Sequence, residues 1–156
     1  MGDGWLDERE ARAWRGLQLM HLHLDGALAR QLGDSSELSL QDYGILVALT
    51  SQPCDRMRAY ELARFIAWDK TRLSHHLKRM IARGLIAKEA CPTDRRGFDI
   101  VVTADGRRAI EAAAPGHVEA VRRLFLDHVS LDELEVLASV SERVTAALGC
   151  AGDEES

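Results

Sequence analysis

The feature that most constrains this chain is the stretch from Ala59 to Val102, where two short helical patterns are followed by two strand-like segments. Apolar residues at helical spacing predict a first helix over Arg58 to Ala67 and a second over Lys70 to Arg83. Asp69 stands directly before the second helix, where a carboxylate can accept a hydrogen bond from an unpaired backbone N–H. Gly84 stands directly after it, and glycine readily adopts the left-handed conformation that ends a helix. The rest of the chain must fit around this order of helix, helix, strand and strand.

The two strand-like segments, Leu85 to Glu89 and Phe98 to Val102, predict a β-hairpin. Between them, Pro92 to Gly97 combines turn-forming residues with two arginines, which predicts a tight and charged tip. Two helices followed by such a hairpin predict a winged helix-turn-helix lobe, a DNA-binding arrangement in which the second helix lies in the major groove.

The second helix has an aliphatic face and a basic face. Leu73, Leu77, Met80 and Ile81 follow the i, i+4, i+7, i+8 spacing of a buried face. Four side chains on or near the opposite face are candidates for reading base edges: Arg72, Ser74, His75 and Arg79. Three at the margins suit phosphates, which add affinity without sequence information: Lys70, Thr71 and Lys78. The simpler interpretation is that this basic face is merely solvated.

The charge distribution favours DNA binding by the middle of the chain. The net charge is -5. However, Asp55 to Arg108 holds 13 Lys and Arg against 7 Asp and Glu, while the remainder holds 7 against 18. The local field at a contact surface attracts phosphate, so the middle of the chain can bind an anion although the whole chain is acidic.

Long helices are predicted on both sides of this lobe. Asp7 to Leu32 has an apolar stripe that ends at Gly33, and Ser39 caps a second helix that extends to about Ser51. After the lobe, Thr103 precedes a helix to about His128 that contains Pro115, and a Ser-x-x-Glu pattern opens a last helix. The predicted segments are 1–38 for N-terminal dimerisation, 39–103 for the DNA-binding lobe, 104–148 for C-terminal dimerisation and 149–156 for an acidic tail.

The segment from Leu73 to Ile86, the Asp94-Arg-Arg-Gly tip and the passage from Val101 to Gly106 resemble the MarR family of bacterial transcriptional regulators. The resemblance spans about Trp14 to Leu148. It implies a homodimer with intertwined first and last helices, bound to double-stranded DNA at a pseudo-palindromic operator. It also implies that Asp94 orients Arg96 while Arg95 or Arg96 enters the minor groove. Ser74-His75 stands where family members often have Thr-Arg.

The predicted fold class is therefore mainly α with a small β-wing: a winged helix-turn-helix lobe plus long N- and C-terminal dimerisation helices. The apolar stripes of the end helices could also be the core of a monomer. We favour a dimer interface, because the small central lobe cannot cover two long stripes at opposite ends of the chain.

Other functions find little support in the sequence. The six histidines form no HxxxH or HExxH pattern, so no metal site and no cofactor are expected. Cys54 and Cys91 could sense oxidants, but neither has an evident resolving partner. No GxSxG or similar nucleophile motif indicates an enzyme. An acidic start and the lack of an apolar run of about 18 residues predict a cytoplasmic protein without a membrane segment.

The function predicted from the sequence is that of a homodimeric repressor that is relieved by a small ligand. An aromatic or acidic ligand would suit the cleft that the family places between the dimer helices and the DNA-binding lobe. The candidates to line it are Trp14, His21, Tyr43 and Trp68, which could equally be ordinary core or surface residues. The alternative function is a ligand or redox sensor that keeps the winged shape without sequence-specific DNA binding.

Overall fold

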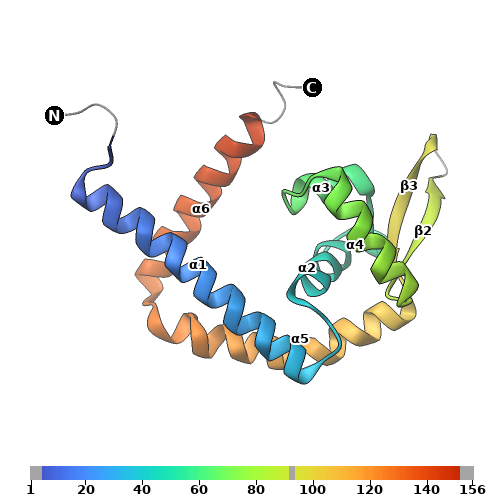
Figure 1. The fold of residues 1–156 in the computed structure, drawn as a ribbon, viewed down its shortest axis with the longest axis horizontal. Coiled ribbons are helices and arrows are strands. Elements are labelled where there is room, and N and C mark those ends of the chain that lie inside the picture. The colour runs from blue at the N-terminus through green and yellow to red at the C-terminus, as the bar shows by residue number, and fades with distance from the viewer. Residues whose placement is uncertain (1–4, 92–93, 152–156) are drawn as a thin grey trace. The chain divides into compact units, whose positions relative to one another are not determined.

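The computed structural model describes residues 5–91 and 94–151, with the backbone alone at 91, 94–96, 150 and 151. The main helices are α1 (Glu8–Ser35), α2 (Leu40–Thr50), α3 (Ala59–Phe65), α4 (Lys70–Ala82), α5 (Ala104–Leu124) and α6 (Leu131–Ala151), as Figure 1 shows. The strands are β1 (Arg56–Arg58), β2 (Ile86–Cys91) and β3 (Asp94–Val102). Short 3-10 turns at Pro53–Asp55 and Leu126–His128 complete the chain. The predicted fold class is confirmed.

The chain divides into two compact units, Met1–Val118 and Glu119–Ser156. The first unit holds α1, the winged lobe and most of α5. The second holds the end of α5 and the whole of α6.

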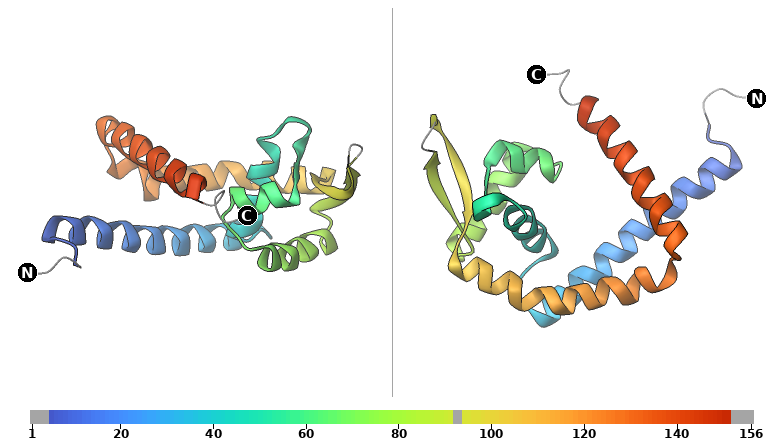
Figure 2. Two further views of the ribbon diagram at one scale, coloured as in Figure 1. Left: turned by 90° about the horizontal axis from the view of Figure 1, so that it is seen from above. Right: turned by 180° about the vertical axis from the view of Figure 1, so that it is seen from behind.

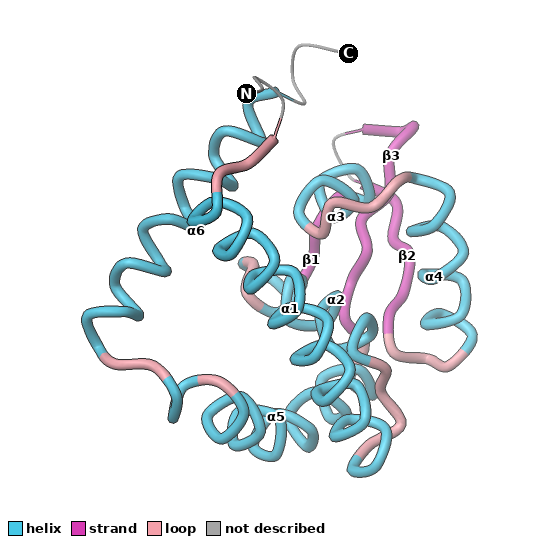
Figure 3. Tube along the Cα trace, turned by 60° about the vertical axis from the view of Figure 1, so that its left-hand side comes forward, coloured by secondary structure: helices cyan, strands magenta, loops and turns pink. Residues whose placement is uncertain are grey.

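The lobe contains a strand that the sequence pattern did not indicate. The sheet has the order β1-β3-β2, and both pairings are antiparallel (Figure 3). β1 ends at Arg58, where the sequence predicted the start of a helix, and its three residues are too few to show an alternating pattern. Its side chains form a charged network across the sheet: Arg56 Nη2 lies 2.9 Å from Glu89 Oε2, and Arg58 Nε lies 3.4 Å from Asp99 Oδ1. Cross-strand charge pairs of this kind add a modest stabilisation to the backbone pairing of β1 with β3.

The predicted helix-turn-helix is confirmed. The carboxylate of Asp69 accepts from the Arg72 backbone N–H at 2.8 Å and caps α4. Gly84 ends the helix region with φ of 73°, the left-handed conformation expected there. The hairpin of β2 and β3 then projects as an arm at the edge of the lobe (Figure 2).

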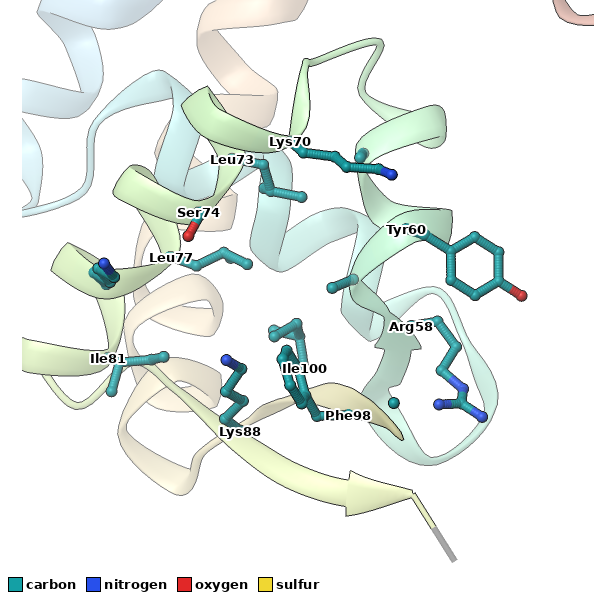
Figure 4. A pocket seen from close by; sticks show the side chains of 14 residues that line it. Arg58, Tyr60, Lys70, Leu73, Ser74, Leu77, Ile81, Lys88, Phe98 and Ile100 are labelled. Carbon is teal, nitrogen blue, oxygen red and sulfur yellow. The ribbon is translucent and has the colours of Figure 1, made fainter. Parts of the chain in front are cut away.

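The core of the first unit lies where α2, α3, α4 and the sheet meet. Its largest fully buried apolar side chains are Leu32, Ile45, Leu46, Leu49, Leu62, Met80, Ile86 and Ile100. One residue that the sequence placed on the buried face of α4, Ile81, is 37% exposed instead. Ile81 lines a pocket between α4 and the β2–β3 hairpin (Figure 4).

Helices α1, α2 and α6 each begin at a capping motif. Asp7 and Ser39 form reciprocal capping boxes with Glu10 and Asp42 at the starts of α1 and α2. Ser130 and Glu133 do the same for α6. The expected stop at Gly33 was wrong: α1 continues to Ser35, because one glycine in a helix costs only about 1 kcal/mol and does not forbid helix.

Candidate nucleic-acid interface

The basic face of α4 is exposed as the sequence predicted. Leu73, Leu77 and Met80 are buried on one side of the helix. The seven predicted helix residues are all exposed: Lys70, Thr71, Arg72, Ser74, His75, Lys78 and Arg79. A single amphipathic helix thus brings three arginine or histidine side chains and their polar neighbours to one surface.

The buried Asp42 side chain on α2 forms hydrogen bonds that attach α4 to the rest of the lobe. This carboxylate is only 2% exposed. Its Oδ1 lies 2.8 Å from His76 Nε2, and its Oδ2 accepts from Arg83 Nη1 at 2.7 Å. Oδ2 also accepts from the Ser39 backbone N–H at 2.9 Å. The middle and the end of α4, the helix predicted to lie in the major groove, are therefore attached to one buried group.

The charge on Asp42 is stabilised by these partners. Burial by itself would raise the pKa of Asp42, but the hydrogen bonds from Arg83 and Ser39, with the positive charge of Arg83, outweigh it. The pKa lies below its ordinary value as a result. The group is a carboxylate at neutral pH.

His76 connects this buried carboxylate to the exposed face. A carboxylate only accepts, so His76 Nε2 carries the proton in the bond to Asp42. A guanidinium only donates, so His76 Nδ1 accepts from Arg79 Nη2 at 2.8 Å. The imidazole bonds both partners in this arrangement, and it holds Arg79 in place.

A second arginine of the face is held by an aromatic ring. The guanidinium carbon of Arg72 lies 4.0 Å from the centre of the Trp68 ring, a cation–π contact. Trp68 also packs edge-on against His76, with ring centres 5.3 Å apart. Arg72, Arg79, Trp68 and His76 line one small pocket of about 260 Å³. Two candidate base-reading arginines are thus positioned before any DNA is bound.

The remaining predicted site residues are distributed as follows. Asp94, Arg95 and Arg96 begin β3, and their side chains lie outside the described part of the chain, as does that of Cys91. Trp14 and His21 are exposed on α1. Tyr43 packs against His117, with ring centres 4.2 Å apart. Trp68 contacts Arg72, whose guanidinium lies over its ring.

Three residues of the interface were missed by the sequence reasoning. They are His76, Asp42 and Arg83, none of which was among the site candidates named from the sequence. Arg83 binds Asp42 and the Glu37 carbonyl, the latter at 2.5 Å. A polar residue at a buried helical position was the one available signal, because His76 shares the face of Leu73 and Met80.

Other kinds of site find no support in the described residues. No three His, Cys, Asp or Glu side chains in that part of the chain gather as metal ligands would. Within the same residues, no helix has the length and apolarity to cross a membrane. Cys54 is an exposed free thiol in the turn before β1.

The fold and the exposed basic helix define a winged helix-turn-helix protein. Residues 36–97 match the model of the MarR family. The structure resembles AbsC, a MarR family transcriptional regulator from Streptomyces coelicolor, with a TM-score of 0.86 and 35% identity over 92% of this chain and 97% of that chain. It also resembles Sco3205 from the same organism, solved in complex with DNA, with a TM-score of 0.87 and 33% identity over 92% and 94% of the two chains.

A curated relative agrees with these structures. The transcriptional regulator HosA of Escherichia coli O111:H- is 27% identical over 119 residues, which are 76% of this chain and 86% of HosA. The chain belongs to the MarR family of transcriptional regulators.

Proposed function

We propose that this protein is a sequence-specific DNA-binding regulator that acts as a homodimer on a pseudo-palindromic operator. The proposal rests on the arrangement of α4. The exposed face of this helix presents Arg72 and Arg79, and Asp42 anchors its buried side. An α-helix fits the major groove, where arginine can bond guanine bidentately. Sco3205, which is 33% identical, was solved with DNA.

The residues proposed to read bases are Arg72, Ser74, His75 and Arg79, and those proposed to bind phosphates are Lys70, Thr71 and Lys78. At the tip of the hairpin, Asp94, Arg95 and Arg96 are proposed to approach the minor groove. Two copies of the lobe would occupy half-sites about 10 base pairs apart.

The dimer is proposed to form through α1 and α6. Each helix, within its own unit, exposes a series of large apolar side chains. On α1 these include Trp14, Leu17 and Leu22, and on α6 they include Val136, Val144 and Leu148. Exposed apolar surface on this scale is typical of an interaction site.

The protein is proposed to act in the cytoplasm, by binding and not by catalysis, as a repressor that a small ligand releases. A ligand achieves release by binding better to the state that does not bind DNA. The predicted cleft residues Trp14, His21, Tyr43 and Trp68 remain candidates for such a site. Of these, Tyr43 has a neutral aromatic partner, because burial lowers the pKa of His117.

The test is a comparison of two variants across DNA sequences and salt concentrations. Wild-type affinity for duplexes from the region upstream of its own gene should fall steeply with salt, because bound phosphates release counterions. Arg79→Ala should cost about 1–3 kcal/mol on the preferred duplex and relax specificity. Lys78→Ala should weaken binding to all duplexes alike and reduce the salt slope by about 1.

Two results would contradict the proposal. One is wild-type binding that shows no preference over random duplex. The other is an equal loss on every sequence for both variants, which would remove the distinction between reading bases and binding phosphates.

A further inference from the structure

The two adjacent histidines of α4 have different environments. His75 is exposed, whereas His76 is only 7% exposed. His76 lies on the same side of the helix as the buried Leu73 and Met80. A polar side chain on this packed side needs hydrogen-bond partners, and both ring nitrogens of His76 have one. His76 therefore lies behind the exposed basic face and can act on DNA only through a neighbour.

The bonds of the His76 ring have a fixed direction. Nε2 lies 2.8 Å from Asp42 Oδ1, and Nδ1 lies 2.8 Å from Arg79 Nη2. Because a carboxylate only accepts and a guanidinium only donates, the proton is on Nε2 and the lone pair of Nδ1 faces Arg79. Arg83 and the Ser39 backbone N–H hold the Asp42 carboxylate in turn. The buried carboxylate thus determines which ring nitrogen is the acceptor for Arg79.

Arg79 gains a defined position from this acceptor. Arginine bonds guanine with two parallel N–H donors, which requires the guanidinium to be held in one plane and at one place. A guanidinium has several N–H donors, so the bond to His76 leaves others for a base. Holding a long side chain in place before binding also avoids part of the entropy cost of ordering it on the DNA. The contact with His76 therefore bears on how well Arg79 can discriminate between base pairs.

We propose that His76 is a positioning residue that sets the sequence specificity of Arg79, and that a second proton on its ring, at Nδ1, removes this specificity. The inference rests on the proposed function, in which Arg79 reads a base. A ring with protons on both nitrogens cannot accept from Arg79, and its positive charge repels the guanidinium. Arg79 is then free to bond a phosphate, which carries no sequence information. The protein would still bind DNA but would distinguish sequences less well.

The surroundings of His76 determine how this ring responds to pH. The charged groups of the cluster are one carboxylate and three guanidiniums: Asp42 on α2, Arg72 and Arg79 on α4, and Arg83 directly after it. The carboxylate favours a second proton on the ring, and the guanidiniums oppose it. The pKa of Asp42 lies below its ordinary value, so this group stays charged in mildly acidic solution. Histidine is the side chain that ordinarily changes charge between about pH 5 and 8, which is therefore the range to examine.

The test measures discrimination between two duplexes as a function of pH. Discrimination is the Kd for a random duplex divided by the Kd for the preferred duplex from the region upstream of the gene. For the wild type it should fall about tenfold between about pH 8 and pH 5, since one arginine–base contact is lost. His76→Gln should keep the high value throughout, because its amide can donate to Asp42 and accept from Arg79 but does not titrate. His75 is present in both proteins, so its own titration cannot explain a difference between them.

A second comparison tests whether His76 acts through Arg79. His76→Leu removes the acceptor and should lower discrimination about tenfold at every pH. Arg79→Ala should show low discrimination without a pH dependence, and adding His76→Leu to it should cause no further loss. If His76→Leu does not fold, the pH profiles of His76→Gln and Arg79→Ala still decide. His128→Gln, which changes an exposed histidine in the turn after α5, should follow the wild-type profile.

The state of the ring can be measured without DNA. Two-bond ¹H–¹⁵N NMR of the free protein distinguishes a protonated from an unprotonated ring nitrogen. Nδ1 of His76 should be unprotonated at about pH 8, and it should gain its proton over the pH range in which discrimination falls.

The possible failures are distinguishable. If the wild type prefers its own duplex equally at every pH, or if His76→Gln loses discrimination as the wild type does, the inference is overturned and the proposed function stands. A further loss when His76→Leu is added to Arg79→Ala would also overturn it, because His76 would then act by another route. If the wild type shows no preference at any pH, the proposed function fails, whatever NMR shows for the ring.

Discussion

Asp42 has a larger role than its position in the chain suggests. An acid in the first turn of a helix is favoured by the partial positive charge of the helix N-terminus, and such residues are ordinarily exposed. Here α4 packs across the start of α2 and brings His76 and Arg83 to the same carboxylate. A buried charge is costly unless it is paired and hydrogen-bonded, and Asp42 is both. This one residue therefore fixes where the recognition helix lies.

Asp42→Asn should lower the free energy of unfolding by about 2 kcal/mol at pH 7, because hydrogen bonds to a charged group are lost. The pKa of Asp42 is lowered in the folded state, so its contribution is complete above the ordinary value of 3.8. The difference between wild type and variant should therefore shrink as the pH falls below 3.8. Urea unfolding at a fixed protein concentration, repeated from neutral to acidic pH, measures it.

Asp34→Asn is the matched control, since it makes the same change at an exposed position of α1. It should alter the free energy of unfolding little at any pH. A difference for Asp42→Asn that stays constant at acidic pH would show that the carboxylate charge is not the source of the stability.

At the scale of elements, backbone segments approach closely at the junction between the hairpin and α5. Thr103 Oγ1 donates to the Gly84 carbonyl at 2.5 Å, and the Gly106 backbone N–H donates to the same hydroxyl at 3.0 Å. A Cβ at Gly106 would overlap the Leu85 carbonyl oxygen. The start of α5 can approach the end of α4 only because residue 106 has no side chain.

Gly106→Ala should therefore destabilise the protein by about 3 kcal/mol, since the backbone must move to relieve the overlap. Gly44→Ala makes the same substitution inside α2, where a Cβ would have no atom within 4 Å. That variant should be more stable than wild type by about 0.5–1 kcal/mol, because alanine favours helix. Urea unfolding compares the two, and a stable Gly106→Ala variant would refute the close contact.

Element α4 also shows how one helix can serve several surfaces. Its three sides bury Met80 in the core, present Arg72 and Arg79 to solvent, and line the pocket with Leu77 and its neighbours. A substitution on any one side that shifts the helix therefore also moves the residues on the other two sides.

For the whole molecule, the acidic net charge and the DNA-binding function are compatible because the charges are separated along the chain. The segment from Asp55 to Arg108 carries a net charge of +6 and the rest of the chain carries -11, which together give -5. Acidic flanking segments repel DNA and so favour an approach by the basic lobe alone. In the proposed dimer, a second basic lobe would meet the same duplex.

Val144→Glu tests the dimer. Val144 is 53% exposed on α6, and a charge there would be buried without a partner if this face forms the interface. The dimer dissociation constant should rise roughly a hundredfold, and operator affinity should fall because one lobe alone meets one half-site. Sedimentation equilibrium measures the change in mass.

Ser139→Glu is the control, since it adds the same charge on another side of α6, next to Arg143. It should leave the mass unchanged. A Val144→Glu protein with unaltered mass would show that this side of α6 is not part of an interface.

The sequence by itself determined the elements and their order. The starts of α1, α2, α4 and α6 follow from capping residues, and the buried sides of the helices follow largely from apolar spacing. These signals act between residues three or four positions apart, so they are readable without a fold. The exposed basic side of α4 was predictable for the same reason.

Only the tertiary structure decided which residues hold α4 in place and which pocket this helix lines. His76 and Arg83 lie 34 and 41 positions from Asp42, and β1 pairs with a strand more than 40 positions away. The pocket between α4 and the β2–β3 hairpin forms only when the hairpin folds back beside α4. No local pattern encodes such contacts, because they arise from the packing of whole elements against one core.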